Sequence, residues 1–82
     1  MKIQPLPPLN SLIVFEAVAR HLSFTSAAKE LNVTQGAISR QIRLLEEYLG
    51  ESLFERSTRE VSLSPVGRRY YRTVHLMLQE IA

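Results

Sequence analysis

The chain has 82 residues, a formal net charge of +2 and 45% hydrophobic residues, as expected of one small globular domain. It has no cysteine, which excludes a disulfide framework and a thiolate metal site. No apolar run approaches the ~20 residues that a membrane span needs, and the first residues lack the apolar core of a signal peptide. We therefore expect a soluble, cytoplasmic chain that needs no cofactor.

The positive charge is concentrated in one half of the chain. There is no aspartate, and every arginine except Arg20 lies at or after residue 40, almost all in the second half: Arg40, Arg43, Arg56, Arg59, Arg68, Arg69 and Arg72. For a nucleic-acid-binding protein, where the cations lie matters more than the net total. A solvated surface of mixed charge is the alternative interpretation.

An extended tail is expected over residues 1–8, which include three prolines, and a first helix then runs to about Arg20. Asn10 or Ser11 is the expected cap of this helix, because a short side-chain oxygen accepts from the free amides of the first turn. One apolar stripe at helical spacing is expected to face the core: Leu12, Phe15, Val18 and Ala19.

A second helix is expected to begin after the cap Ser23 and to end at Asn32, since asparagine tolerates the left-handed conformation that stops a helix. Val33 and a new cap, Thr34, follow at once. One helix therefore ends and another begins within about three residues, which is the spacing of a helix-turn-helix.

The third helix is predicted over residues 35–49, and Gly50 is expected to end it in the left-handed conformation. Leu44 and Tyr48, on a flank of this helix, are expected to pack against the first helix or the hairpin. The apolar residues of one narrow arc are predicted to be core: Ile38, Ile42, Leu45 and Leu49.

Residues 53–56 and 61–63 alternate as two strands of a hairpin, with residues 57–60 as the turn between them. Ser64 is the expected cap of a fourth helix, and Pro65 suits its first position, where no amide hydrogen bond is lost. The predicted fold is thus mainly α: a three-helix core, a two-stranded hairpin wing and a long linker helix.

The linker helix, residues 65–82, has more apolar surface than one short domain is expected to cover. Pairing with the same helix of a second copy would cover it, and burial against the first helix is the alternative for part of it. Arg68, Arg69 and Arg72 oppose the helix dipole, so they are expected to contact phosphate or to pair with glutamates elsewhere. The expected dimer contacts are Tyr70, Tyr71, Val74, Met77, Leu78 and Ile81.

The start of the third helix has the side chains that contact base edges. In a helix-turn-helix, the N-terminal part of the second helix of the motif enters the major groove. Gln35 suits adenine, Arg40 suits guanine, and Ser39 suits a base or a phosphate. The alternative is that these side chains are merely solvated polar groups.

Gly36 and Arg43 complete the predicted base-contacting set. Gly36 is a poor helix former but permits a close backbone approach, while Arg43 contacts DNA or forms an ordinary helical ion pair with Glu47. Contacts to the DNA backbone are expected from the helix-turn-helix and from the hairpin tip. The alternative interpretation of the hairpin tip is a solvated turn that does not contact DNA. These residues are Ser23, Thr25, Thr34, Arg56, Ser57 and Arg59.

From Leu9 to about Gly67 the chain closely resembles the N-terminal domain of LysR-type transcriptional regulators. The run from Ala19 to Thr25 is similar to the subgroup that contains glycine-cleavage and β-lactamase regulators. The most specific segments are Ser23-Phe24-Thr25 with Ala27-Ala28, Leu45-Glu46 with Leu49-Gly50, and Leu53-Phe54-Glu55-Arg56.

The resemblance implies a winged helix-turn-helix over residues 9–64, a dimerising linker helix, and a larger C-terminal domain, absent here, that alone binds a small-molecule effector. A tetramer is possible in such a full-length protein. The chain departs from the family at Gly36, where proline is frequent, and at Leu22-Ser23, where many members have Gly-Ser. The residues that match the family's base contacts are Gln35, Gly36, Ser39 and Arg40, and those that match its phosphate contacts are Thr34, Arg56 and Arg59.

Two hypotheses of function follow, and a third is set aside. The first is sequence-specific binding of double-stranded DNA by a dimeric regulator, and the second is a winged-helix protein-interaction module that does not bind DNA. Catalysis is not expected, because His21 and His75 have no evident acid or base partner and no nucleophile or phosphate-binding motif is present.

Overall fold

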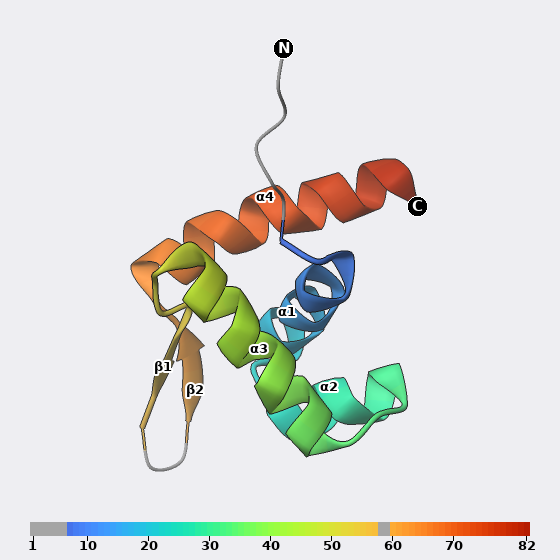
Figure 1. The fold of residues 1–82 in the computed structure, drawn as a ribbon, viewed down its shortest axis with the longest axis vertical. Coiled ribbons are helices and arrows are strands. Elements are labelled where there is room, and N and C mark those ends of the chain that lie inside the picture. Colours follow the sequence, from blue (N-terminus) through green and yellow to red (C-terminus); the bar gives the residue numbers. More distant parts are fainter. Residues whose placement is uncertain (1–6, 58–59) are drawn as a thin grey trace.

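The computed structural model describes residues 7–57 and 60–82, which form four helices and one antiparallel two-stranded sheet. The predicted mainly α fold with a hairpin is confirmed. The expected contacts of Arg59 lie outside the described residues. The elements are α1 (Leu9–His21), α2 (Phe24–Leu31), α3 (Gln35–Leu49), β1 (Phe54–Arg56), β2 (Val61–Leu63) and α4 (Pro65–Ile81) (Figure 1).

Helix α1 is the central element and contacts α2, α3 and α4. Figure 1 shows α2, the first turn of α3 and the far end of the hairpin toward one end of the molecule, while α4 crosses the other end. The hairpin pairs Phe54 with Leu63 and Arg56 with Val61. The turn between α2 and α3 and the wing therefore lie on the side of the molecule away from most of α4, whose first turn adjoins β2.

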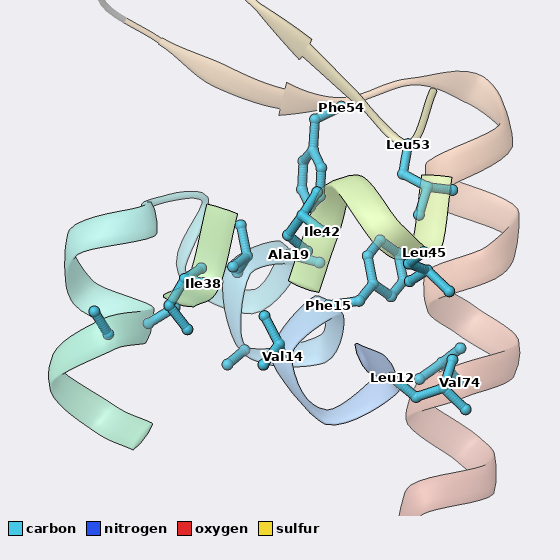
Figure 2. Packing of buried hydrophobic residues seen from close by; sticks show 14 residues of the cluster. Leu12, Val14, Phe15, Ala19, Ile38, Ile42, Leu45, Leu53, Phe54 and Val74 are labelled. Atoms are coloured by element: carbon cyan, nitrogen blue, oxygen red, sulfur yellow. The ribbon is translucent and has the colours of Figure 1, made fainter. Parts of the chain in front are cut away.

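The core forms where α1, α3, α4 and β1 meet (Figure 2). The predicted stripe of α1 is buried, and three of the four expected core residues of α3 have no exposed surface: Ile38, Ile42 and Leu45. Phe15, also fully buried, has its ring centroid 5.6 Å from those of Phe54 and Tyr70. Aromatic pairs at such separations stabilise a core beyond the area that they bury.

The predicted packing of Leu44 and Tyr48 is wrong. Their side chains are 45% and 47% exposed. At 100° per residue, both lie roughly 90° or more from the middle of the arc that Ile38, Ile42 and Leu45 define. Because α1 and the hairpin cover only that arc, these two side chains remain at the surface.

The start of α1 also differs from the prediction. The helix begins at Leu9, with Pro8 at the capping position and no side-chain cap. Ser11 is fully buried, and its hydroxyl donates to Gln41 Oε1 of α3 at 2.7 Å. A short polar residue in a first turn satisfies the capping pattern, but here it makes a long-range contact that local sequence does not indicate.

Both boundaries of the helix-turn-helix are confirmed. Ser23 Oγ accepts from the Ser26 N–H, and Thr34 Oγ1 accepts from the Ala37 N–H, each at 3.1 Å. Asn32, at φ 60°, ends α2 in the left-handed conformation, and Gly50, at φ 70°, ends α3 in the same way. These local capping interactions fix where α3 begins.

An ion-pair network joins α1, α2 and α4. Arg20 lies 2.9 Å from a Glu16 oxygen and 2.7 Å from a Glu30 oxygen, and it holds the pKa of Glu30 down at about 2. The expectation that the histidines have no partner is wrong. His21 Nε2 lies 2.6 Å from Glu30, and His75 Nδ1 lies 3.4 Å from Glu16.

The junction between the hairpin and α4 is unusually tight. Ser64 Oγ accepts from the Gly67 N–H at 2.9 Å and donates to the Ser52 carbonyl at 2.7 Å, which confirms Ser64 as the cap of α4. A Cβ added to Gly67 would lie 2.0 Å from the carbonyl oxygen of Leu53. Glycine at residue 67 is therefore needed for α4 to approach the start of β1.

We predict that Gly67→Ala lowers the free energy of unfolding by about 2–3 kcal/mol, because the added methyl group forces backbone apart in a packed region. Gly36→Ala is the matched control. Its Cβ would meet only Thr34 Oγ1, at 3.9 Å, so the better helix former should stabilise the protein by up to ~1 kcal/mol. Urea unfolding of the two variants measures both effects, and equal stability changes of the same sign would contradict the steric argument.

The chain has Leu22, not glycine, in a left-handed turn between α1 and α2. Its φ is 52°, a conformation that costs an L-residue other than glycine about 1–2 kcal/mol. We predict that Leu22→Gly raises stability by about 1 kcal/mol, which corresponds to roughly 4–8 °C in melting temperature. Leu44→Gly is the control, since Leu44 is equally exposed but helical, and its replacement should lower the melting temperature instead.

Candidate nucleic-acid interface

The polar side of the first turns of α3 is open to solvent. Gln35, Gly36, Arg40 and Arg43 are exposed, and Ser39 is half-buried. The opposite side of the helix packs on α1, as the core residues show. A helix held by one face with its polar N-terminal part uncovered meets the geometric requirement for entering a major groove.

Arg43 and Arg56 both line a polar hollow between α3 and β1. Within the described residues, no ion pair joins Arg43 to Glu47, so the ordinary helical pair weighed from the sequence is not formed. Glu46 Oε2 instead accepts from the Leu53 N–H at 2.8 Å, which ties α3 to the start of β1. The hollow is lined by Ser39, Arg43, Glu46, Ser52, Phe54 and Arg56.

The wing places Arg56 over an aromatic ring of α2. The guanidinium carbon lies 4.5 Å from the centroid of the Phe24 ring, within the range of a cation–π interaction. The Phe24 ring in turn lies 5.9 Å from that of Phe54. Arg56 is therefore oriented at the surface between α2 and the wing, an arrangement that its sequence neighbours do not indicate.

Ser57 holds the hairpin turn. Its backbone N–H donates to the Glu60 carbonyl at 3.0 Å, and its hydroxyl accepts from the Glu60 N–H at 3.2 Å. The side chain remains exposed beside Arg56. A contact from Ser57 to DNA would have to coexist with these turn hydrogen bonds.

Side chains of the two helices of the helix-turn-helix meet at the surface. The Gln35 Nε2 group donates to Thr25 Oγ1, although the two residues lie ten positions apart, and both side chains are exposed. The hydroxyls of Ser23 and Thr34 cap their own helices. Sequence reasoning placed these residues in one region but did not find the Thr25–Gln35 contact.

The interface carries arginines that form no salt bridge with the described residues. In residues 7–57 and 60–82, the salt bridges involve only Arg20, His21 and His75 as cations. Arg40, Arg43 and Arg56 thus face solvent without a carboxylate within bonding distance. Such a patch attracts the phosphate backbone of nucleic acid.

Helix α4 divides into a covered and an uncovered side. Val74 is 3% exposed and points toward Leu12 (Figure 2), so the premise that one domain cannot cover the stripe is wrong at this residue. The Tyr70 and Tyr71 rings pack on Phe15, and burial raises the pKa of both hydroxyls. Met77 and Leu78 are partly buried against the same core.

Two large apolar residues of α4 are exposed. Ile81, which the sequence indicated, is 66% exposed, and Leu76, which it did not, is 55% exposed. Leu76 falls outside the stripe because, at 100° per residue, it lies about 130° from the middle of the arc of Tyr70, Val74, Met77 and Ile81, between the charged Arg72 and Glu80. A single apolar residue on a polar face forms no apolar periodicity, so the sequence pattern did not indicate Leu76.

The described residues contain no group of His, Asp or Glu side chains arranged to hold a metal ion. None of the helices described for this chain is long and apolar enough to cross a membrane.

A three-helix core with a helix-turn-helix and an antiparallel hairpin defines the winged helix-turn-helix class. Residues 9–68 match the family model described as bacterial regulatory helix-turn-helix protein, lysR family, and the chain belongs to this family. The resemblance found in the sequence is confirmed.

The chain is 51% identical over 76 residues to a glycine cleavage system transcriptional activator homolog of Haemophilus influenzae, covering 93% of this chain and 25% of that relative. It is also 51% identical over 80 residues to the transcriptional activator AmpR of Providencia stuartii, covering 89% of this chain and 27% of the relative. The chain thus spans about a quarter of the length of these relatives.

Solved structures show the same fold. The BenM DNA-binding domain in complex with catB site 1 DNA superposes with a TM-score of 0.87 and 40% identity, over 90% of this chain and 83% of that one. The CbnR DNA-binding domain in its DNA complex gives 0.84 and 35%, over 90% and 85%.

Proposed function

We propose that this chain binds double-stranded DNA in a sequence-specific manner, as the DNA-binding domain of a dimeric transcription regulator. The observation that carries the proposal is the uncovered polar start of α3 beside an arginine-bearing wing, with no carboxylate paired to Arg40, Arg43 or Arg56. A helix presented in this way enters the major groove, while the wing contacts the backbone or the minor groove.

The roles of individual residues follow from their chemistry and position. Gln35 and Arg40 contact adenine and guanine edges, Ser39 contacts a base or a phosphate, and Arg43 reaches the groove from the next turn. Gly36 lets the helix backbone approach the DNA closely. The backbone contacts are Ser23, Thr25, Thr34, Arg56, Ser57 and Arg59.

The comparisons support DNA over a protein partner. BenM and CbnR, to which this chain is 40% and 35% identical, were solved as DNA-binding domains with DNA bound. The relatives are named as transcriptional activators, so a non-enzymatic role in the cytoplasm is part of the proposal. The protein-interaction alternative requires DNA affinity that is weak and insensitive to salt.

Residues 9–64 are the proposed DNA-binding unit and residues 65–82 the proposed dimerisation helix. Since the relatives are about four times longer, we assign control by a small-molecule effector, and any tetramer, to a further domain of the whole protein. This chain would supply DNA recognition and part of the dimer contact.

The proposed dimer pairs the uncovered face of α4 with its copy. Arg72, Leu76 and Glu80 recur every four residues and are all exposed. If two helices cross antiparallel with Leu76 on the two-fold axis, Arg72 of one copy faces Glu80 of the other, and the pair forms twice. Charge complementarity therefore favours the antiparallel arrangement. The flanking residues that add apolar contact, or support the helix from beneath, are Tyr70, Tyr71, Val74, Met77, Leu78 and Ile81.

We predict that Arg40→Ala weakens binding to a preferred site about 5- to 150-fold, the loss expected for one base contact of about 1–3 kcal/mol, and weakens binding to random DNA much less. Preferred sites come from selection on random duplexes, and affinities from fluorescence anisotropy. An equal loss on both kinds of DNA would remove Arg40 from base recognition.

Arg56→Ala is expected to weaken all DNA sequences alike and to reduce the slope of log affinity against log salt by about one, because one phosphate contact is lost. Arg68→Ala removes the same charge from the first turn of α4, which is not among the proposed DNA contacts, and should leave the slope unchanged. Flat titrations with the unaltered protein at all salt concentrations would favour the protein-interaction alternative.

We predict that Arg72→Glu weakens dimerisation about tenfold, since two surface pairs of about 0.2–1 kcal/mol each become repulsive. Arg72→Glu combined with Glu80→Arg should restore the dimer, because the pairs re-form with opposite polarity. Sedimentation equilibrium of the single, double and unaltered chains measures the dissociation constant. A double variant no better than the single one would contradict the antiparallel register.

A further inference from the structure

We propose that Thr25 is a positioning residue for base recognition: its hydroxyl holds the Gln35 side chain in the orientation that meets an adenine edge. The inference rests on the proposed function, in which the start of α3 contacts bases. It changes the role of Thr25 from a contact to the DNA backbone into a determinant of specificity that acts through Gln35.

The contact is produced by the geometry of the helix-turn-helix. Thr25 lies in the first turn of α2, and Gln35 is the first residue of α3. The left-handed Asn32 and the cap Thr34 turn the chain so that Gln35 Nε2 donates to Thr25 Oγ1. Both side chains are exposed, so the hydrogen bond lies on the surface that DNA would occupy and contributes nothing to the core.

The chemistry of the amide permits both interactions at once. A glutamine amide has two N–H donors and one carbonyl oxygen. One N–H is used by Thr25, which leaves one donor for adenine N7 and the carbonyl for the adenine N6 amino group. Guanine presents two acceptors at these positions, so the same amide satisfies only one of them, and discrimination depends on holding both amide groups against the base edge.

Holding the side chain before binding favours recognition. A glutamine side chain loses conformational entropy about several rotatable bonds when it is fixed on a base, and this entropy cost opposes binding. A hydrogen bond that already restricts the side chain in the free protein reduces that cost. The Thr25 hydroxyl is not used for capping, because the α2 cap is Ser23 and the α3 cap is Thr34.

Three variants separate positioning from the other roles of Thr25. Thr25→Val keeps the shape and removes the hydroxyl, Thr25→Ser keeps the hydroxyl, and Gln35→Ala removes the side chain that is positioned. Fluorescence anisotropy measures the affinity of each variant for four duplexes: the selected site and the three sites that differ from it at one base pair. That base pair is the one at which Gln35→Ala loses discrimination. Salt slopes and melting temperatures are measured alongside.

Thr25→Val is expected to lower discrimination at that base pair on the order of 3- to 10-fold, with an unchanged salt slope, and Thr25→Ser is expected to retain it. In the Gln35→Ala background, Thr25→Val should have no further effect on discrimination. A uniform loss on all sequences would make Thr25 a phosphate contact and overturn the inference, whatever the salt slope, because a neutral hydroxyl releases no counterion.

Failure of the inference and failure of the proposed function give different results. If Gln35→Ala loses discrimination and Thr25→Val does not, the positioning role is wrong while base contact by α3 stands. If Gln35→Ala itself discriminates as well as the unaltered chain, no base contact exists at Gln35 and the inference is overturned, whereas the proposed function fails only if the unaltered chain shows no preference among DNA sequences.

Discussion

The fold depends on the aromatic packing around Phe15. This fully buried ring of α1 contacts Phe54 of β1 and Tyr70 of α4, so one side chain sets the positions of the wing and of the linker helix relative to the core. The series continues from Phe54 to Phe24, and Arg56 lies over the Phe24 ring. A cation at the proposed DNA surface is thereby oriented by the same packing that closes the core. The wing consequently packs against α2 through the same set of aromatic contacts.

Polar contacts complete this frame at the places where helices end. Glu46 accepts from the Leu53 N–H, and the Ser64 N–H donates to the Leu53 carbonyl, so both backbone groups of Leu53 are satisfied between α3 and α4. Buried backbone groups left unpaired would each cost about 1–3 kcal/mol. The Glu46 carboxylate keeps its negative charge when it accepts this hydrogen bond, and the two arginines of the hollow, Arg43 and Arg56, outnumber it.

The helix-turn-helix was predictable from sequence because its boundaries are local. Caps, a left-handed asparagine and a terminal glycine act within a few residues, and the bounds of α2 and α3 were found from them. Contacts between distant elements were not predictable. Ser11 fits the pattern of a cap but donates to Gln41, which lies thirty residues away. Val74 fits an exposed stripe but is covered by the core, because the position of α1 against α4 depends on the whole fold and not on local sequence. The exposed candidates at the start of α3 were found, whereas the partners of Gln35 and Arg56 were not.

The two helical glycines have different explanations, one in the packing of the fold and the other in the proposed function. Gly67 is required by the fold itself, because a methyl group there would overlap the Leu53 carbonyl. Gly36 has open space around it, so nothing within the domain requires glycine at a position where alanine would be about 1 kcal/mol more favourable for the helix. A residue that costs stability without a structural reason, at the exposed start of α3, is accounted for if another molecule approaches the helix backbone there. In the proposed function that molecule is DNA, which contacts the surface formed by Gly36 and its exposed neighbour Gln35.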